Sequence, residues 1–294
     1  MAGNMSRRVL RLPIVRNLVK WRSLLLNLMT GMTRLNRIES MRFLDLELPR
    51  DPRYMDPRRL LRHQHQVCSQ NGEDGMIQEV FRRIGTTDKV FVEVGIGDGC
   101  ENNTALLLSQ GWTGYWIDGS DKFLENVSQK ADLQNCLKWS VSMVTRENIA
   151  SLLKSMGTPK EFDLLSVDID QNTYYVWEGM REYRPRVVVL EYNATLPADM
   201  NWKVRYDPNR VWNGTHNFGA SLKACEILGR DLGYSLVGCD SIGCNAFFIR
   251  DDLVGDHFAS PFTSENHYEP ARFGLTIRRS HRTAILDRDP VAAG

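Results

Sequence analysis

One segment constrains the fold more than any other: residues 90–99, VFVEVGIGDG, in which a β-prone run leads into glycines at alternate positions. β-Branched and aromatic residues favour a buried strand, and glycine tolerates the positive φ angles of tight turns. In open α/β sheets, ligands bind outside the carboxyl ends of the strands, next to such turns. The segment therefore predicts a nucleotide-like ligand at this edge, with an ordinary strand–helix turn as the alternative.

The spacing of the glycines separates two classes of ligand. The dinucleotide-binding fingerprint requires G-x-G-x-x-G, and Cys100 occupies its last position here. The pattern present, Glu93-x-Gly95-x-Gly97-x-Gly99, resembles motif I of the class I S-adenosylmethionine-dependent methyltransferases. That resemblance implies S-adenosylmethionine as the cofactor.

Apolar runs alternate with helical patterns from residue 90 onward. The expected strands are 90–94, 114–118, 137–141, 162–168 and 186–192, and the expected helices between them are about 102–110, 121–132, 145–156 and 172–183. Such alternation predicts right-handed βαβ units, a parallel sheet and helices on both of its faces.

The end of the pattern differs from its start. A helix at about 217–232 precedes two strand patterns, 234–239 and 244–250, that a short glycine-containing turn joins into a hairpin. We therefore predict an α/β fold with a Rossmann-like sheet of five parallel strands closed by an antiparallel hairpin. This is the order of the class I methyltransferase fold, whereas a dehydrogenase would more often add a sixth parallel strand.

Length and composition favour one large domain with an appendage, because 294 residues with 42% hydrophobic content can bury a full core. We expect a basic helical arm and linker at 1–64, a methyltransferase domain at 65–264 and a C-terminal tail at 265–294, with its last residues disordered. The spacing of apolar residues predicts a further helix that ends near Gly85.

The charge is concentrated at the start of the chain. Residues 1–40 have eight basic residues and only Glu39 as an acid, so a chain of net charge +1 has a body of about −6. Such a body lacks the basic face that nucleic-acid binding needs. The basic helix has three interpretations: contact with an anionic membrane face, packing on its own domain, or packing on a partner subunit in a homo-oligomer. Charges interrupt its apolar residues too often for a membrane span or a signal core.

The six cysteines form no C-x-x-C pair and no zinc-ligand spacing. Most lie in apolar segments, which indicates free thiols in a reducing compartment. We therefore expect a cytoplasmic protein, with a peripheral position on the inner face of the membrane as the alternative.

Three polar residues at strand ends are candidates for holding the cofactor. Asp118 ends the second strand, where a carboxylate can accept hydrogen bonds from both ribose hydroxyls; its alternative role is to cap the next helix. Glu93 can meet the cationic amino group of the methionine moiety. Ser142, after the third strand, is the candidate for the adenine end.

The fourth and fifth strands deliver polar groups to the same edge, because parallel strands end there together. Asp168 or Asp170 could remove the proton from an acceptor hydroxyl. Alternatively, Asp168, Glu191 and Asn193 could hold Mg²⁺ through oxygen ligands. A third interpretation is that these groups cap helices or pair with neighbouring arginines.

The segment 194–216 has the length and composition of a substrate-binding loop. Its aromatic rings could stack on sugar faces and its basic residues could meet phosphate. The candidate substrate residues are Trp202, Arg205, Tyr206 and Trp212. His216 is an alternative catalytic base, and a self-packed surface loop is the alternative for the whole segment.

Several phrases together resemble the FkbM-like family of class I methyltransferases. They are SQNGEDG at 69–75, the glycine turn, SVDID at 166–170, EYN at 191–193, NFGASLK at 217–223 and GCDSIGCNAFFIR at 238–250. One departure is Gln171-Asn172, where related sequences tend to have glycine. The resemblance, over residues 65–253, implies O-methylation of sugar hydroxyls or natural-product intermediates.

The resulting hypothesis is an S-adenosylmethionine-dependent O-methyltransferase that acts by in-line displacement on a glycan or glycolipid precursor. The alternatives are O-methylation of a small secondary metabolite and a non-catalytic scaffold that binds the cofactor.

Overall fold

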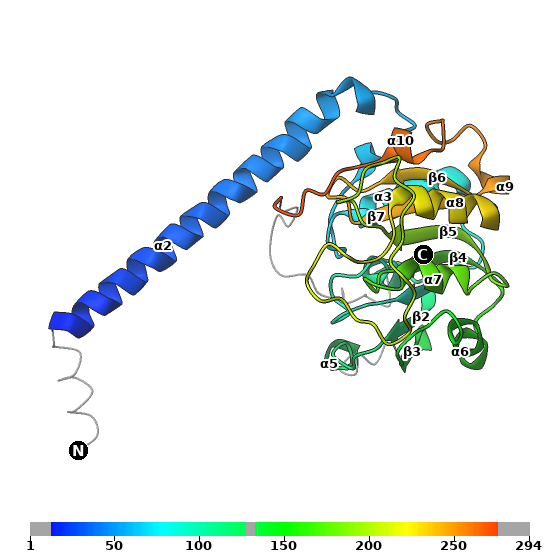
Figure 1. Ribbon diagram of the computed structural model, residues 1–294, viewed down its shortest axis with the longest axis horizontal. Helices are drawn as coiled ribbons and strands as arrows, with labels where there is room; N and C mark the ends of the chain where they lie inside the picture. The colour runs from blue at the N-terminus through cyan, green and yellow to red at the C-terminus, as the bar shows by residue number, and fades with distance from the viewer. Residues whose placement is uncertain (1–12, 128–132, 134, 276–294) are drawn as a thin grey trace, which may run out of the picture.

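The computed structural model describes residues 13–127, 133 and 135–275, which form a layered α/β body and a long projecting helix (Figure 1). The body is built on one seven-stranded sheet with the order β3-β2-β1-β4-β5-β7-β6. Its strands are β1 (Val90–Val94), β2 (Thr113–Asp118), β3 (Leu137–Val141), β4 (Glu161–Val167), β5 (Arg184–Glu191), β6 (Tyr234–Cys239) and β7 (Asn245–Arg250).

The strand directions confirm the predicted fold class. Strands β1 to β5 pair in parallel, and β7 pairs antiparallel with both β5 and β6. This order, with its closing hairpin, is that of the class I methyltransferase fold. The chain runs outward from β1 to β3 and then returns to place β4 on the other side of β1. Ligands of open α/β sheets bind at such a switch point.

Helices cover both faces of the sheet, as expected. They are α3 (Glu73–Ile84), α4 (Ala105–Ser109), α5 (Leu124–Val127), α6 (Ile149–Met156), α7 (Thr173–Glu178), α8 (Leu222–Leu232), α9 (Asp251–Val254) and α10 (Ser264–His267). Several begin later than predicted because residues at the carboxyl edge form loops instead of first turns. The expected helix 121–132 extends into residues 128–132, which lie outside the described part of the chain.

Two hydrophobic cores lie on opposite faces of the sheet because successive strand residues point to opposite sides. On β1, Val92 and Val94 join the core under α6, α7 and α8, whereas Phe91 joins the core under α3, α4 and α5. Side chains from β4 and β5 divide in the same way. Coverage on both faces explains why the central strands β1 and β5 are mostly apolar, whereas the edge strand β3 is largely exposed.

The linker between the projecting helix and the body packs against the body and against the C-terminal segment. Helix α2 (Pro13–Arg42) is followed by four short helical turns: η1 (Phe43–Glu47), η2 (Leu48–Arg50), η3 (Pro52–Tyr54) and η4 (Leu60–His63). Leu60 is fully buried in the second core. The hydroxyl of Tyr54 donates to Glu269 Oε1 at 2.8 Å, so part of the predicted tail packs against the linker.

None of the six cysteines, all of which lie in the described part of the chain, forms a disulfide. None of the helices within the described ranges is long and apolar enough to cross a membrane. The predicted disorder at the end of the tail concerns residues 276–294, which lie outside the described residues.

Candidate active site

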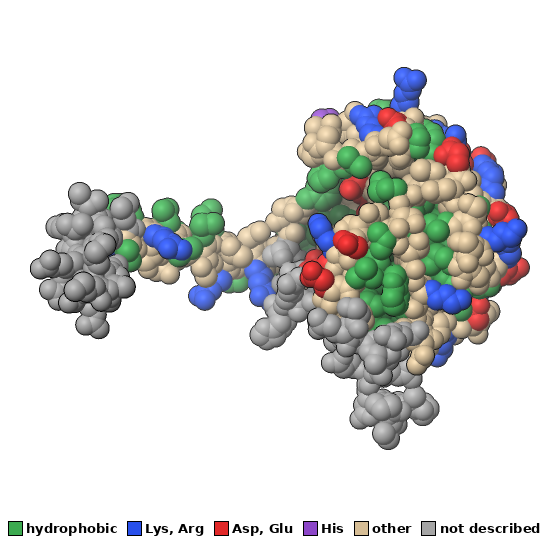
Figure 2. Space-filling model, turned by 90° about the horizontal axis from the view of Figure 1, so that it is seen from below, with side chains coloured by type: hydrophobic (Ala, Val, Ile, Leu, Met, Phe, Trp, Pro, Cys, Tyr) green, Lys and Arg blue, Asp and Glu red, His purple; other side chains and the backbone are tan. Residues whose placement is uncertain are grey.

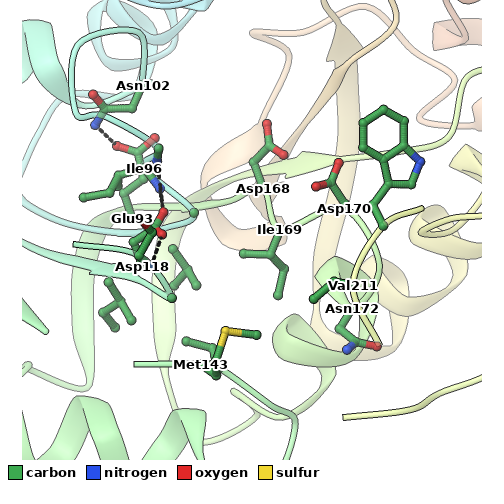
Figure 3. Close-up of a pocket in the computed structure, with 18 of the residues that line it drawn as sticks. Glu93, Ile96, Asn102, Asp118, Met143, Asp168, Ile169, Asp170, Asn172 and Val211 are labelled. Carbon is green, nitrogen blue, oxygen red and sulfur yellow. Dashed lines mark hydrogen bonds between the residues drawn. The ribbon is translucent and has the colours of Figure 1, made fainter. Parts of the chain in front are cut away.

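A cavity of about 710 Å³ opens at the carboxyl edge of the sheet, where β1, β2 and β4 end. Its volume lies within the range of small-molecule sites. Figure 3 shows Glu93, Ile96 and Asp118 on one side of the cavity, with Asp168 and Asp170 across from them and Met143 below. The cavity is thus located at the switch point of the sheet.

The three glycines of the turn have three different roles. A Cβ atom on Gly95 would lie 1.7 Å from the carbonyl oxygen of Asp168, so this turn packs directly on the backbone after β4. A Cβ on Gly97 would meet nothing within 4 Å, and this residue lines the cavity. Gly99 is outside the lining, because it packs on Trp116 and Phe123. All three have positive φ angles, which glycine adopts without strain.

Asp118 ties the glycine turn to the end of β2. Its Oδ2 accepts hydrogen bonds from the backbone amides of Ile96 and Gly97, both at 2.9 Å, and its Oδ1 accepts from Ser120 N at 2.8 Å. Figure 3 shows the first of these contacts at the wall of the cavity. The carboxylate thus fixes the loop and also lines the space where the expected ligand would lie.

Glu93 is buried beneath the same turn and braces the loop that follows it. It accepts hydrogen bonds from Asn102 Nδ2 at 2.6 Å, Asn103 N at 2.8 Å and Thr104 N at 3.1 Å. Burial raises the pKa of Glu93, and these donors act in the opposite direction. Because residues 102–104 serve this carboxylate, helix α4 begins at Ala105 and not at the expected residue 102.

Asp168 and Glu191 form a hydrogen-bonded pair of carboxyl groups at the ends of β4 and β5. Burial, followed by the charge of Asp170, raises the pKa of Asp168 to about 7. Burial and the charge of Asp168 raise the pKa of Glu191 well above its usual range. Two carboxyl groups in contact cannot both ionise, so the pair shares one proton. The hydrogen bond lowers the pKa of Asp168 and raises that of Glu191, so once Asp168 is ionised the remaining proton is on Glu191, which donates it to Asp168.

The backbone around Asp170 positions this pair. Asp170 has a φ of 60°, an uncommon conformation for a residue with a side chain. Its amide donates to Glu191 Oε2 at 2.8 Å, and Thr173 Oγ1 donates to the same oxygen at 3.0 Å. Strained residues of this kind cluster at functional sites. The side chain of Asp170 lines the cavity beside Asp168, and burial raises its pKa.

A further wall comes from elements far apart in the sequence. Glu73, at the start of α3, is fully buried and accepts from Asn71 N at 2.8 Å and from Asn245 Nδ2 at 2.7 Å. Asn245 begins β7 opposite Glu191, because antiparallel β7 starts at the edge where β5 ends. Glu73 and Asn245 both line the cavity. The buried Oδ1 of Asn245 has no hydrogen-bond partner among the described residues.

Of the predicted substrate residues, the structure places Trp212 in the cavity lining, next to Val211 and Arg210. Tyr206 lies elsewhere, with its ring 4.8 Å from that of Tyr175. Trp202 packs against the core, and its amide donates to Ser221 Oγ at 3.0 Å. Arg205 and His216 are exposed side chains outside the cavity lining.

The departure at Gln171-Asn172 has a structural role in this loop. Asn172 Nδ2 donates to the carbonyl oxygen of Asp207 at 3.0 Å, and Gln171 Nε2 donates to that of Asn217 at 3.3 Å. The two amides tether the 194–216 loop and the segment after it to the end of β4. Glycine could make neither contact.

The donor set does not fit the alternative magnesium site. Asn193 is fully buried, and its Nδ2 donates to the carbonyl oxygens of His216 and Phe218 at 2.8 and 2.9 Å. Its Oδ1 accepts from Thr195 Oγ1, so this oxygen is engaged within its own turn. In the described part of the chain, no three His, Cys, Asp or Glu residues are grouped to hold a metal ion. We therefore assign no metal to this cavity.

The remaining predicted cofactor residues, Glu93, Gly95, Gly97 and Ser142, also line the cavity. Asn102, Met143 and Arg210 line it without having been candidates in the sequence. Asn102 could have been found as a polar residue that closely follows the glycine turn. Arg210 gave no such signal, because only the path of its loop brings it to the cavity.

No protein-family model and no curated protein sequence matches this chain. Solved structures with a similar arrangement include the N-terminal domain of EvdMO1 with S-adenosylhomocysteine bound, which is 11% identical, with 59% of this chain and 78% of that chain covered and a TM-score of 0.38. TrmK from M. capricolum, in complex with S-adenosylhomocysteine, is 10% identical, with coverages of 60% and 67% and a TM-score of 0.36. An O-methyltransferase family protein from Burkholderia thailandensis is 13% identical, with coverages of 60% and 57% and a TM-score of 0.36.

Proposed function

We propose that this protein binds S-adenosylmethionine in the cavity and transfers its methyl group to a hydroxyl of an acceptor. One observation supports this most: Asp168, which is hydrogen-bonded to Glu191 behind it, lines the same cavity as the open glycine turn and Asp118. A proton acceptor and a nucleoside-sized cradle at one edge suit group transfer to a hydroxyl.

The residues present fit the cofactor. Gly97 leaves open space where any larger residue would place a Cβ atom, so a ligand can approach the backbone closely. Asp118 would hold the ribose hydroxyls, and Ser142, Met143 and Ile117 would surround the adenine. The buried Oδ1 of Asn102 has no hydrogen-bond partner among the described residues and suits a ligand that donates. S-adenosylmethionine supplies an electrophilic methyl group when bound.

The charge of the lining favours the same ligand. Among the described residues, seven acidic side chains and one basic side chain, Arg210, line the cavity. The seven acidic residues are Glu73, Glu93, Asp98, Glu101, Asp118, Asp168 and Asp170. A cationic ligand with a sulfonium and an ammonium group relieves the repulsion among them. An anionic nicotinamide dinucleotide would increase it.

The proton of the acceptor hydroxyl would pass to Asp168. A general base works best when its pKa lies near the working pH, and burial with the charge of Asp170 raises the pKa of Asp168 to about 7. The protonated carboxyl group of Glu191 donates a hydrogen bond to Asp168, and this hydrogen bond keeps the Asp168 carboxylate oriented. Alignment of the acceptor oxygen with the methyl carbon supplies much of the catalysis in an in-line displacement.

The acceptor that fits best is a neutral sugar hydroxyl of a glycan or glycolipid precursor. Glu73, Asp170 and Asn245 offer acceptor oxygens to hydroxyl groups, and Trp212, half exposed, offers a ring for a sugar face. The acidic lining disfavours a phosphate beside the reacting hydroxyl. A small secondary metabolite rich in hydroxyls is the alternative acceptor, and a scaffold without turnover is the alternative role.

Calorimetry with the full chain tests the cofactor. We expect S-adenosylmethionine and S-adenosylhomocysteine to bind, and NAD to give no heat of binding. Binding of NAD in place of S-adenosylmethionine would refute the proposal. Radiolabelled methyl transfer to glycolipid and small-molecule extracts then distinguishes the acceptors, and cofactor binding without transfer to any fraction would indicate a scaffold.

The substitution Asp168→Asn tests the proton transfer. The amide keeps the shape and can still accept from Glu191, but it cannot remove a proton. We expect cofactor affinity to change little and kcat to fall by roughly 10²–10⁴-fold. Full turnover with normal cofactor binding would remove Asp168 from this role. Activity that is lost with a chelator and restored by Mg²⁺ would contradict the metal-free site.

A further inference from the structure

Helix α2 exposes large apolar side chains along most of its length. Trp21 is 64% exposed, Met32 70% and Leu35 64%. Val19, Leu24, Leu25, Leu26, Leu28, Met29 and Ile38 are also exposed. Figure 1 shows the helix projecting from the body, so the described part of the domain does not cover these residues. Exposed apolar surface of this extent usually marks an interaction site.

Most of these side chains share one face of the helix. At 3.6 residues per turn, Trp21, Leu25, Leu28, Met32 and Leu35 form a continuous stripe, which Leu24 and Met29 widen to an arc of about 140°. We call this arc the apolar face of α2. Leu26 and Val19 lie on the opposite side and are single exposed residues.

The charges of the same helix are almost all positive. Residues 13–42 contain six basic residues and one acidic residue, Glu39. The Oε2 atom of Glu39 lies 4.0 Å from the Nη1 atom of Arg42, at the end of the helix next to the body. Lys20 and Arg22 flank the apolar face on its two sides. Figure 2 shows hydrophobic and basic side chains along the arm.

Two partners could cover such a face: a second copy of the helix or an anionic membrane surface. The 4–3 spacing of the stripe also suits a coiled coil, in which opposite charges at the flanking positions commonly set the choice of partner. In α2 these positions include Arg22, Met29 and Asn36 on one side and Leu24, Gly31 and Ile38 on the other, with no acidic residue to pair. The charge pattern therefore favours the membrane.

We propose that α2 binds the surface of an anionic phospholipid bilayer, with its apolar face in the headgroup region and its basic residues against lipid phosphates. Basic residues beside an apolar stripe extend their charged ends to the interface, and tryptophan is enriched at that depth. None of the described helices is long and apolar enough to cross a membrane, so α2 would lie on the surface. This proposal is independent of the proposed chemistry.

Co-sedimentation of the full chain with lipid vesicles tests this proposal. We expect binding to vesicles that contain phosphatidylglycerol, little binding to pure phosphatidylcholine, and weaker binding at high salt, since salt screens surface charge. The double variant Leu28→Ser with Met32→Ser should weaken binding by roughly tenfold or more. The matched control, Val19→Ser with Leu26→Ser, removes two exposed apolar residues from the opposite side and should bind normally.

The charge requirement has its own variant, Lys20→Gln with Arg22→Gln, which should lose the preference for anionic vesicles. Equal binding to neutral and anionic vesicles would overturn the electrostatic part of the proposal. Light scattering without lipid distinguishes the other partner. A dimer that the Leu28 and Met32 changes dissociate, without vesicle binding by the unmodified chain, would assign the apolar face to a second copy and overturn the proposal.

Discussion

A Cβ atom at Gly95 would lie 1.7 Å from the carbonyl oxygen of Asp168, so the glycine turn after β1 and the backbone after β4 are in direct contact. The amide of Asp168 also donates to the carbonyl oxygen of Val94 at 2.9 Å. The expected cofactor loop and the proposed catalytic carboxylate are therefore positioned by the same few backbone atoms. Three predictions follow from this region of the structure.

The first concerns the open space at Gly97. Gly97→Ala would place a methyl group in the cavity, since no atom of the described residues lies within 4 Å of the added Cβ. We expect a loss of stability of about 1 kcal/mol from the positive φ angle and a fall in S-adenosylmethionine affinity of roughly tenfold or more. Thermal unfolding and calorimetry measure the two effects.

Gly157→Ala provides the matched control, because Gly157 ends α6 with a φ of 76° and lies outside the cavity. It should show a similar loss of stability with unchanged cofactor affinity. If both variants lose affinity equally, the effect of Gly97 reflects stability and not space in the cavity.

The second prediction concerns Asp118, which accepts from three backbone amides. Asp118→Asn turns an NH₂ group toward at least one of these donors, which loosens the turn and removes an acceptor for a ribose hydroxyl. We expect cofactor affinity to fall by roughly tenfold, or about 1.4 kcal/mol. Asp121→Asn, an exposed carboxylate outside the lining, should bind as the unmodified protein does. Unchanged affinity in Asp118→Asn would place the ribose elsewhere.

The third prediction concerns pH. Burial raises the pKa of Asp168 to about 7 in the folded protein. In an unfolded chain the pKa of an aspartate is about 3.9. Between these values the folded state keeps a proton that the unfolded state releases. Stability therefore decreases as pH rises through this window.

Asp168→Asn removes this titration. Between about pH 5 and about pH 8, the unmodified chain should lose ~2–3 kcal/mol of its free energy of unfolding through this group, and we expect the variant not to show this loss. Denaturant unfolding at several pH values measures the difference. Parallel pH profiles for the two proteins would contradict the raised pKa of Asp168.

Local patterns in the sequence predicted the sheet well because the central strands β1, β4 and β5 are buried on both faces. The strands 90–94, 137–141 and 234–239 match β1, β3 and β6 at both ends. The turn residues were also readable, since positive φ angles favour glycine. The helix starts were less accurate, because Asn102, Asn103 and Thr104 serve the buried Glu93 and not a first helical turn.

The substrate loop shows why the site was harder to predict. Trp202, Tyr206 and Trp212 have similar chemistry and lie within 11 positions of each other in the sequence. Trp202 and Tyr206 pack against the body, whereas Trp212 lines the cavity. The difference depends on where the loop is tethered to the body. One such tether is the hydrogen bond that Asn172, which precedes α7, donates to the carbonyl oxygen of Asp207 in the loop.

The sequence alone determined which segments along the chain form strands, where the glycine turn lies and which acidic residues stand at the strand ends. These features depend on local propensity and on the period of apolar residues. Tertiary structure decided which polar groups meet. It joined Glu73 from α3 with Asn245 from β7, paired Asp168 with Glu191, and turned Asn193 and His216 away from the cavity. Such contacts depend on how distant segments pack, and a raised pKa exists only once that packing excludes water.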